Sequence, residues 1–421
     1  MNLQAIKDIR DRLEIFDFFR FKILPAAANL EFYCRKYLAE KKDFSCIDDL
    51  KTEASARHWT YTPAAPTVIQ ESVPSQCLPE DALEIVKHGK LIRRKHKRRN
   101  QDPDYLDRML LANLISVKRY PVYETFTCEV PEAIISAPNG AALTANYEAI
   151  IQSTRLIWPK VIMAQVPEAG SCLKGTYVSL LGGFGQNYSH WLIDILVRMA
   201  LVPEGASDLF FLISDPSAGY KWQSLEVLGI PRERIVPLPP GWHRLENLLI
   251  CHAAQRSMVP KKQHLTVLRE RLMKGAFGLE KPAPPWRRVY VSRSKVRRRI
   301  VNEENILPII KEYGFEIIFP EDLSFREQVR IFAETKDIMA PHGGGLFNQC
   351  LSDPLGTVIE IYNPRRYNWD NREVANVLGQ KHWFSYGENV NHMYDMKVDP
   401  KKVAKLLDYA FGKGAILESI Y

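Results

Sequence analysis

The chain has 421 residues, a hydrophobic fraction of 46%, a charged fraction of 25% and a net charge of +8. This composition excludes a disordered chain, and the length fits two domains of about 150–200 residues each. No apolar run reaches about 18 residues, so the sequence predicts no transmembrane helix, and acidic residues near the start argue against a secretory signal peptide.

The N-terminal half begins with helical patterns and continues with an extended segment. Apolar residues at helical spacing predict an N-terminal helical extension over residues 1–60. The proline-rich segment 61–79 predicts a linker or an extended covering segment, and residues 105–114 are helix-like. Further along, the predicted strands are 161–166, 176–181, 209–214, 234–238 and 248–251, and the predicted helices are 189–201 and 222–228.

A second alternating series follows the proline-rich break Lys281–Trp286. Its predicted strands are 289–292, 315–319, 337–340 and 357–362, and its predicted helices are 303–313, 324–335, 346–351 and 400–411. Asn302 is the expected N-cap of the first of these helices, and Ser324 and Glu327 form an expected capping box at the second. Buried strands that alternate with helices predict parallel, doubly wound sheets. The sequence therefore predicts an α/β protein of two Rossmann-like domains that face a cleft, an N-terminal domain 61–280 and a C-terminal domain 281–421 that ends in a helix.

A glycine-rich turn follows the predicted strand 337–340 and opens a helix. Its sequence is His342-Gly343-Gly344-Gly345-Leu346-Phe347-Asn348. Such a turn exposes backbone N–H groups at the positive end of a helix, where a diphosphate fits. A tight turn alone needs fewer glycines, which favours a ligand loop. HGGG also forms the oxyanion loop of lipases and esterases, but no GxSxG nucleophile motif accompanies it here.

Arginines follow the predicted strand 289–292. Arg293 comes first, and Arg297, Arg298 and Arg299 come shortly after it. An arginine at the carboxyl end of a parallel strand lies at the ligand crevice of such a sheet, and its forked donors suit phosphate oxygens. The alternative is a solvated basic face, which is equally plausible for Arg297.

His190, Asp194 and Arg198 are spaced i, i+4 and i+8 after the glycine-rich loop 182–185, so they share a helix face. A carboxylate one turn from a histidine holds one tautomer and raises its basicity. A simple ion pair with Asp194 explains Arg198 best, whereas we favour a functional role for His190.

Two acidic features allow more than one interpretation. Glu360 lies in the apolar strand 357–362, where an acid needs a partner, and a sugar hydroxyl, a ribose hydroxyl or a buried arginine would each serve. Asp102-Pro103-Asp104 resembles the DxD motif of metal-dependent sugar transferases, but no strand precedes it. We therefore predict a turn there and no metal site.

The positive charge is concentrated in two runs. Residues 87–99 hold eight Lys or Arg and residues 287–299 hold seven, with no acid in either. Such runs favour anionic partners, and we expect 87–99 to contact an anionic surface rather than to take part in chemistry. The seven cysteines form no CxxC pair, which favours reduced thiols. We expect a cytoplasmic protein with peripheral contact to the inner membrane.

Several separated motifs resemble glycosyltransferase family 61, in that family's order: NYSHWLID, YVSR with RRRIVNEENI, FPEDLSFREQVRIFAETKDIMAPHGGGLFNQ, and VIEIYNP. The resemblance covers about residues 176–362 and not the first 150 residues. The family includes capsular polysaccharide biosynthesis proteins, plant xylan xylosyl- and arabinosyltransferases, and animal O-linked N-acetylglucosaminyl transferases. The resemblance implies a GT-B fold and inverting transfer from a nucleotide sugar to a glycan acceptor, with no cofactor and no essential metal.

The resemblance also assigns residues. The expected donor-binding residues, including Arg298 of the basic run and the strand acid Glu360, are Arg293, Arg298, Arg299, Asn302, Glu303, His342, Gly343, Gly344, Gly345, Asn348 and Glu360. The family often has alanine at the position of Gly344. His190 and Asp194 match the family's catalytic His and Asp, and either one could be the base. The alternative function is a non-catalytic binder of acidic glycan or nucleic acid through the basic runs.

Overall fold

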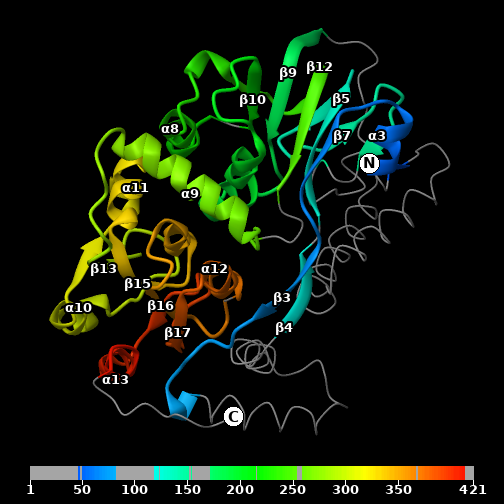
Figure 1. The fold of residues 1–421 in the computed structure, drawn as a ribbon. Helices are drawn as coiled ribbons and strands as arrows, with labels where there is room; N and C mark the ends of the chain where they lie inside the picture. Colours follow the sequence, from blue (N-terminus) through cyan, green and yellow to red (C-terminus); the bar gives the residue numbers. More distant parts are fainter. Residues whose placement is uncertain are drawn as a thin grey trace, which may run out of the picture.

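The computed structural model describes residues 46–47, 50–81, 118–122, 124–150, 153, 171–214, 216–253, 258–366 and 368–412. The predicted helices before residue 46, the predicted helix 105–114, the predicted strand 161–166 and the basic run 87–99 lie outside these residues. The described elements form two main sheets with helices between and around them (Figure 1). No helix in this part of the chain is both long and apolar enough to span a bilayer.

The first sheet is mixed, and ten of its strands lie in the described part of the chain. They are β1 (Cys46–Ile47), β2 (Tyr61–Ala65), β5 (Thr125–Pro131), β6 (Ile134–Ala137), β7 (Ala142–Leu143), β8 (Ala149–Ile150), β9 (Cys172–Leu180), β10 (Leu209–Ile213), β11 (Ile235–Pro237) and β12 (Gly241–His252). β9 pairs in parallel with β10 and β12, and β10 with β11.

The prediction of a purely parallel first sheet is wrong. β12 pairs antiparallel with β5 and β6, and β6, β7 and β8 follow one another antiparallel. The segments that join β5 to β8 are only a few residues long, and such short connections allow antiparallel but not parallel neighbours. β5, β6, β7 and β8 were not predicted from the sequence, whereas the predicted strand 248–251 lies within β12.

The second sheet is parallel, and its strands within the described residues are β13 (Arg287–Val291), β14 (Phe315–Ile318), β15 (Thr335–Pro341), β16 (Thr357–Tyr362) and β17 (Lys381–Tyr386). Their order is β14-β13-β15-β16-β17. Both faces are buried: Val289 and Val291 belong to one hydrophobic cluster and Tyr290 between them to another. The parallel, doubly wound arrangement predicted for this half is confirmed, with β17 as an additional strand.

Helices cover both sheets and join them. They are α3 (Leu50–Ala56), α7 (Tyr188–His190), α8 (Gly219–Val227), α9 (Lys262–Phe277), α10 (Glu303–Glu312), α11 (Phe325–Ala333), α12 (Asp370–Leu378) and α13 (Pro400–Ala410), with the π-helix η2 (Trp191–Ile195) and the 3₁₀-helices η3 (Leu196–Leu201) and η6 (Gly344–Leu351). The predicted capping box of α11 is confirmed, with Ser324 and Glu327 as partners. α9 runs between the two sheets (Figure 1) and contributes Leu265 and Leu268 to a cluster that includes Val178 and Val289, so one core connects both sheets.

The segment 61–81, here called the N-terminal strap, connects the two sheets on another side. Its β2 pairs with β5 of the first sheet, and Gln76 forms a parallel bridge with Trp383 in β17 of the second. Between these points β3 (Val68–Ser72) pairs with β4 (Lys118–Val122). Figure 1 shows the strap in blue as it passes from the first sheet to the second. The prediction of an extended covering segment is confirmed.

Candidate active site

The arginine motif and the glycine turn meet at one edge of the second sheet. Arg293 follows β13 and His342 follows β15, and these two strands are neighbours. The chain continues from β13 to β14 on one side, and from β15 to β16 and β17 on the other. In an open parallel sheet, the point where the strand order reverses is where ligands bind, at the carboxyl ends of the strands.

The glycine turn lies directly against Arg293. A Cβ atom added to Gly343 would lie 2.0 Å from Nη1 of Arg293, and one added to Gly345 would lie 3.0 Å from Cγ1 of Val291. A Cβ atom on Gly344 would have no neighbour within 4 Å among the described residues. Gly343 is therefore required for the close approach of the guanidinium, whereas Gly344 faces open space.

Arg293 and Arg298 form a cationic site that the described residues leave unneutralised. Both are half-buried, and no carboxylate of the described residues forms an ion pair with either one. Arg293 donates from Nη2 to the carbonyl of Arg297 at 2.8 Å, and its buried Nε has no partner. Burial lowers the pKa of Arg293 to about 10, with Arg298 acting in the same direction. Such a site is suited to an anion.

The backbone and surroundings of Arg298 support the same conclusion. Its φ is 62°, a left-handed conformation that is strained for a residue with a side chain. Burial lowers its pKa, and the neighbouring Arg366 and Arg297 lower it further, although Glu360 opposes them. A bound anion would relieve this repulsion.

Three other basic residues of the run 287–299 differ, because each of them has an acidic partner. Arg287 pairs with Glu316 and Glu334 at 2.7 and 3.1 Å, Arg288 pairs with Asp337 at 3.0 Å, and Lys295 pairs with Asp322. The run is therefore not a uniform basic face.

The side chain of His342 is positioned by a hydrogen bond with Glu360. Its Nδ1 lies 2.7 Å from Oε1 of Glu360, which is completely buried. Burial lowers the pKa of His342, with Arg298 and Arg293 adding to this effect and Glu360 opposing it. Burial alone would raise the pKa of Glu360, but the charge of His342 and hydrogen bonds from His342 and His382 lower it to about 2. Glu360 is thus an ionised carboxylate that fixes the ring of His342.

His190 and Asp194 form a second pair of the same kind. Nδ1 of His190 lies 2.7 Å from Oδ2 of Asp194, and Oδ1 of Asp194 accepts the backbone N–H of Met258 at 2.8 Å. The ring of Phe184 lies against the imidazole, with centroids 4.9 Å apart. Arg198 donates to the carbonyl oxygens of Ser179 and Leu181 at 2.8 and 2.9 Å, which holds the end of β9.

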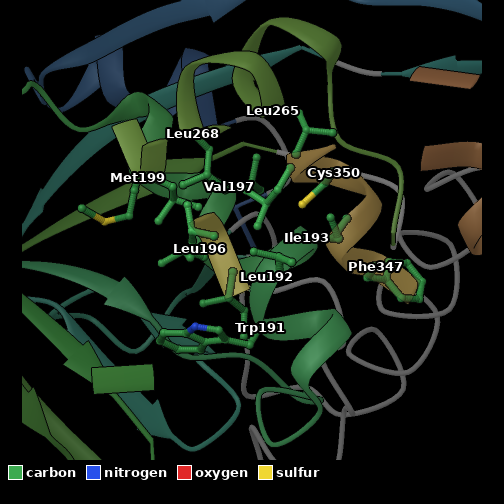
Figure 2. Close-up of a cluster of buried hydrophobic side chains, with 14 of the residues drawn as sticks. Trp191, Leu192, Ile193, Leu196, Val197, Met199, Leu265, Leu268, Phe347 and Cys350 are labelled. Carbon is green, nitrogen blue, oxygen red and sulfur yellow. The ribbon is translucent and has the colours of Figure 1, made fainter. Parts of the chain in front are cut away.

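A hydrogen bond connects the His190 segment to the glycine turn. Oη of Tyr188 in α7 donates to Oδ1 of Asn348 in η6 at 2.6 Å. Asn348 in turn donates to Gln328 of α11 at 3.2 Å. Figure 2 shows that Phe347 and Cys350 of η6 belong to the same apolar cluster as Trp191 and Ile193 of η2. The two candidate motifs, far apart in the sequence, are therefore packed together.

A model of the family Glycosyltransferase 61 matches residues 188–359, a segment that contains both histidine motifs, the arginines and the glycine turn. This segment of the chain is thus similar to glycosyltransferase family 61. The protein is therefore a glycosyltransferase, and enzymes of this kind use a nucleotide-sugar donor and a glycan acceptor in general. No curated protein matches the chain.

Several residues predicted to bind the donor have partners within this glycosyltransferase. Arg299 is exposed, and its Nε lies 3.6 Å from Oδ2 of Asp395. The side chain of Asn302, which was expected to cap α10, forms two hydrogen bonds with the backbone of Val398. Glu303 is buried and accepts hydrogen bonds from Tyr290 and Ser292, both at 2.7 Å. These contacts stabilise the wall of the site.

Two further predicted donor residues, Asn348 and Glu360, are completely buried. Among the described residues, the partners of Glu360 are His342, His382, Tyr362 and Asn371. We therefore describe Glu360 as a residue that positions His342.

The structure adds residues that the sequence analysis missed. His382 lies in β17, a strand that was not predicted, and Tyr188 precedes the predicted helix by one residue. The only sequence signal for this strand is the short segment His382-Trp383-Phe384-Ser385, in which two aromatic residues lie between polar ones. Among the described residues, no group of three or more His, Cys, Asp or Glu side chains is arranged to hold a metal ion.

Proposed function

We propose that the protein is an inverting glycosyltransferase of GT-B architecture that moves a sugar from a nucleotide-sugar donor to a glycan acceptor, without a metal ion or another cofactor, in the synthesis of a capsular or other surface polysaccharide. In this proposal residues 281–421 bind the donor and residues 61–280 the acceptor. The observation that carries the donor assignment is the pair Arg293 and Arg298, whose charges have no carboxylate partner among the described residues beside the glycine turn.

The leaving nucleoside diphosphate carries negative charge that must be stabilised as the glycosidic bond breaks. Arg293 and Arg298 offer forked N–H donors for its oxygens. Gly344 and Gly345 begin η6, so their N–H groups have no acceptor within the helix and can bind an anion. His342 adds a donor when its ring is protonated. These groups together supply the charge that a metal ion supplies in other transferases.

For the base, the geometry favours His190. Asp194 accepts from Nδ1 of His190, which leaves Nε2 to take the proton of the acceptor hydroxyl as its oxygen attacks the anomeric carbon. Both oxygens of Asp194 are already engaged, one of them by the N–H of Met258. We therefore assign His190 as the base and Asp194 as the residue that orients it.

Binding of UDP, GDP, CDP and dTDP, measured by calorimetry, tests the donor site. Arg298→Ala removes a charge-assisted contact, and we expect the tightest of these ligands to lose about 1.5–3 kcal/mol of binding free energy. Lys295→Ala is the matched control, because it removes one charge from the same loop but one that is paired with Asp322. Equal effects of the two variants, or no binding to the wild-type protein, would contradict the proposal.

Metal independence has its own test. We expect transfer to continue after dialysis against EDTA, because arginines, a histidine and helix N–H groups are available to the diphosphate. The measurement is release of nucleoside diphosphate in the presence of acceptor. Turnover that disappears with EDTA and returns with manganese would show that the charge is carried by a metal.

The basic run Lys87–Arg99 lies outside the described residues. We propose that it contacts an anionic surface, such as the inner face of the inner membrane, in a cytoplasmic enzyme. Each Lys or Arg near an anionic bilayer contributes about 1 kcal/mol, so eight together suffice for peripheral contact.

A further inference from the structure

A chain of four buried polar side chains runs from the N-terminal strap to the candidate donor site. Oγ of Ser75 lies 2.9 Å from Nδ1 of His382, and Nε2 of His382 lies 3.1 Å from Oε2 of Glu360. Oε1 of Glu360 lies 2.7 Å from Nδ1 of His342. The exposed fractions of Ser75, His382, Glu360 and His342 are 3%, 5%, 0% and 6%. Water therefore has little access to these contacts.

The ionised carboxylate of Glu360 determines the direction of the hydrogen bonds. A carboxylate only accepts, so Nε2 of His382 and Nδ1 of His342 both carry the proton that they share with it. Nδ1 of a neutral His382 is then an acceptor, and the hydroxyl of Ser75 donates to it. This arrangement leaves Nε2 of His342 as the nitrogen that is not used by Glu360. The carboxylate of Glu360 thus places a proton on Nε2 of His382 and on Nδ1 of His342.

Ser75 is firmly placed because the strap adds to the edge of the second sheet. The N–H of Gln76 donates to the carbonyl of His382 at 2.8 Å, and its carbonyl accepts from Phe384 at 2.9 Å. On either side, Arg372 donates to the carbonyl of Val73 at 3.1 Å and Asp81 pairs with Lys402 at 2.7 Å. The strap therefore presents Ser75 to His382 from a part of the chain outside the matched segment 188–359.

We propose that His382 and Ser75 are positioning residues for His342: through Glu360 they hold the ring orientation in which the protonated Nε2 of His342 donates to the donor diphosphate. This inference rests on the proposed function, because it needs a diphosphate at His342. It assigns a role in donor binding to the strap and to β17, neither of which lies in the matched segment.

The decisive measurement is a double-mutant cycle with nucleoside diphosphate affinity as its readout, using whichever of UDP, GDP, CDP and dTDP binds the wild-type protein best. His382→Leu removes the hydrogen bond to Glu360, and we expect affinity to fall about tenfold, the scale on which loss of a histidine-orienting partner acts. His382→Gln keeps an N–H at the position of Nε2 and should restore most of the affinity. In a His342→Gln background the effect of His382→Leu should disappear, because the two residues act through one contact.

His264→Leu is the matched control for the general effect of losing a buried histidine. His264 also has a hydroxyl partner, Thr125 at 2.7 Å, but it lies in α9 against the first sheet. We expect this variant to lose thermal stability and to keep the affinity of the wild-type protein. If His382→Leu does not fold, Ser75→Ala tests the same chain with a smaller change and an expected loss of about threefold.

The outcomes separate the two proposals. If the wild-type protein binds none of the four nucleotides, the proposed function fails and this inference fails with it. If the wild-type protein binds but His382→Leu and Ser75→Ala do not weaken binding, or if His382→Leu weakens it equally with and without His342, only the inference is wrong. The inference is supported if His382→Leu weakens nucleotide binding only while His342 is present and if His382→Gln restores the affinity.

Discussion

At the scale of single residues, the glycine turn shows that three adjacent glycines have different reasons to be glycine. Gly343 has an extended backbone that any residue adopts, so its requirement is space: a Cβ would lie 2.0 Å from the guanidinium of Arg293. Gly344 has no neighbour within 4 Å in the described structure. A pattern of glycines in the sequence does not report what lies opposite each one.

Gly343→Ala should therefore displace Arg293 and weaken nucleoside diphosphate binding by about tenfold or more, the loss expected for one charge-assisted contact. Gly344→Ala should bind within about twofold of the wild-type protein, because one methyl group enters open space without strain. Calorimetric titration of both variants makes the comparison. Loss of affinity in Gly344→Ala but not in Gly343→Ala would reverse the assignment.

At the scale of elements, the predicted helix 189–201 is three short pieces, α7, η2 and η3. π-Helical turns occur often at functional sites, and this one follows His190 directly. The periodicity correctly predicted that the segment is helical and buried. It did not predict the change of helix type. In this segment Trp191 contacts Ser224 and Tyr220 of α8, and Ile193 belongs to the same apolar cluster as Phe347 and Cys350 of η6 (Figure 2).

The hydrogen bond between α7 and η6 should stabilise the fold measurably. Tyr188→Phe removes the donor to the buried amide of Asn348, and we expect the free energy of unfolding to fall by about 1–3 kcal/mol. Tyr220→Phe is the control, because its ring packs against that of Tyr188 but its hydroxyl bonds an exposed carbonyl. Urea denaturation that gives equal losses for both variants would show that this connection between the motifs is unimportant.

At the scale of the whole molecule, the two sheets are held together on two sides, by the core around α9 and by the strap. Leu78 of the strap is completely buried against Tyr290, Ile306 and other residues of the second sheet unit. The strap is therefore part of the fold and not only a linker.

Leu78→Ala should lower the free energy of unfolding by about 2–5 kcal/mol, through lost burial and the cavity that remains. Val73→Ala in the same strap is the control: its side chain is 65% exposed, and we expect a change within about 0.5 kcal/mol. Urea denaturation compares the two. A small effect of Leu78→Ala would mean that the strap is not seated on the second sheet in solution.

The sequence by itself determined the features that depend on neighbours along the chain. The strands and helices of residues 287–362, the capping box at Ser324, and the meeting of Arg293 with the turn at His342 follow from short-range periodicity, from turn chemistry and from the rule that parallel strands end at one edge. Three of the four family motifs lie in or at the end of this region, which is why the type of enzyme could be predicted.

The tertiary structure alone decided the long-range choices. β12 pairs antiparallel with β5 and β6, and the strap pairs with β17. Glu360, Asn302 and Glu303 likewise find partners outside their own elements. A buried polar group must find some partner, but the sequence does not say which one, because many donors of the right kind are available until packing selects among them. Donor binding by Asn302, Glu303 and Glu360 therefore stays a prediction, and folding decided which partner each of them has inside the protein.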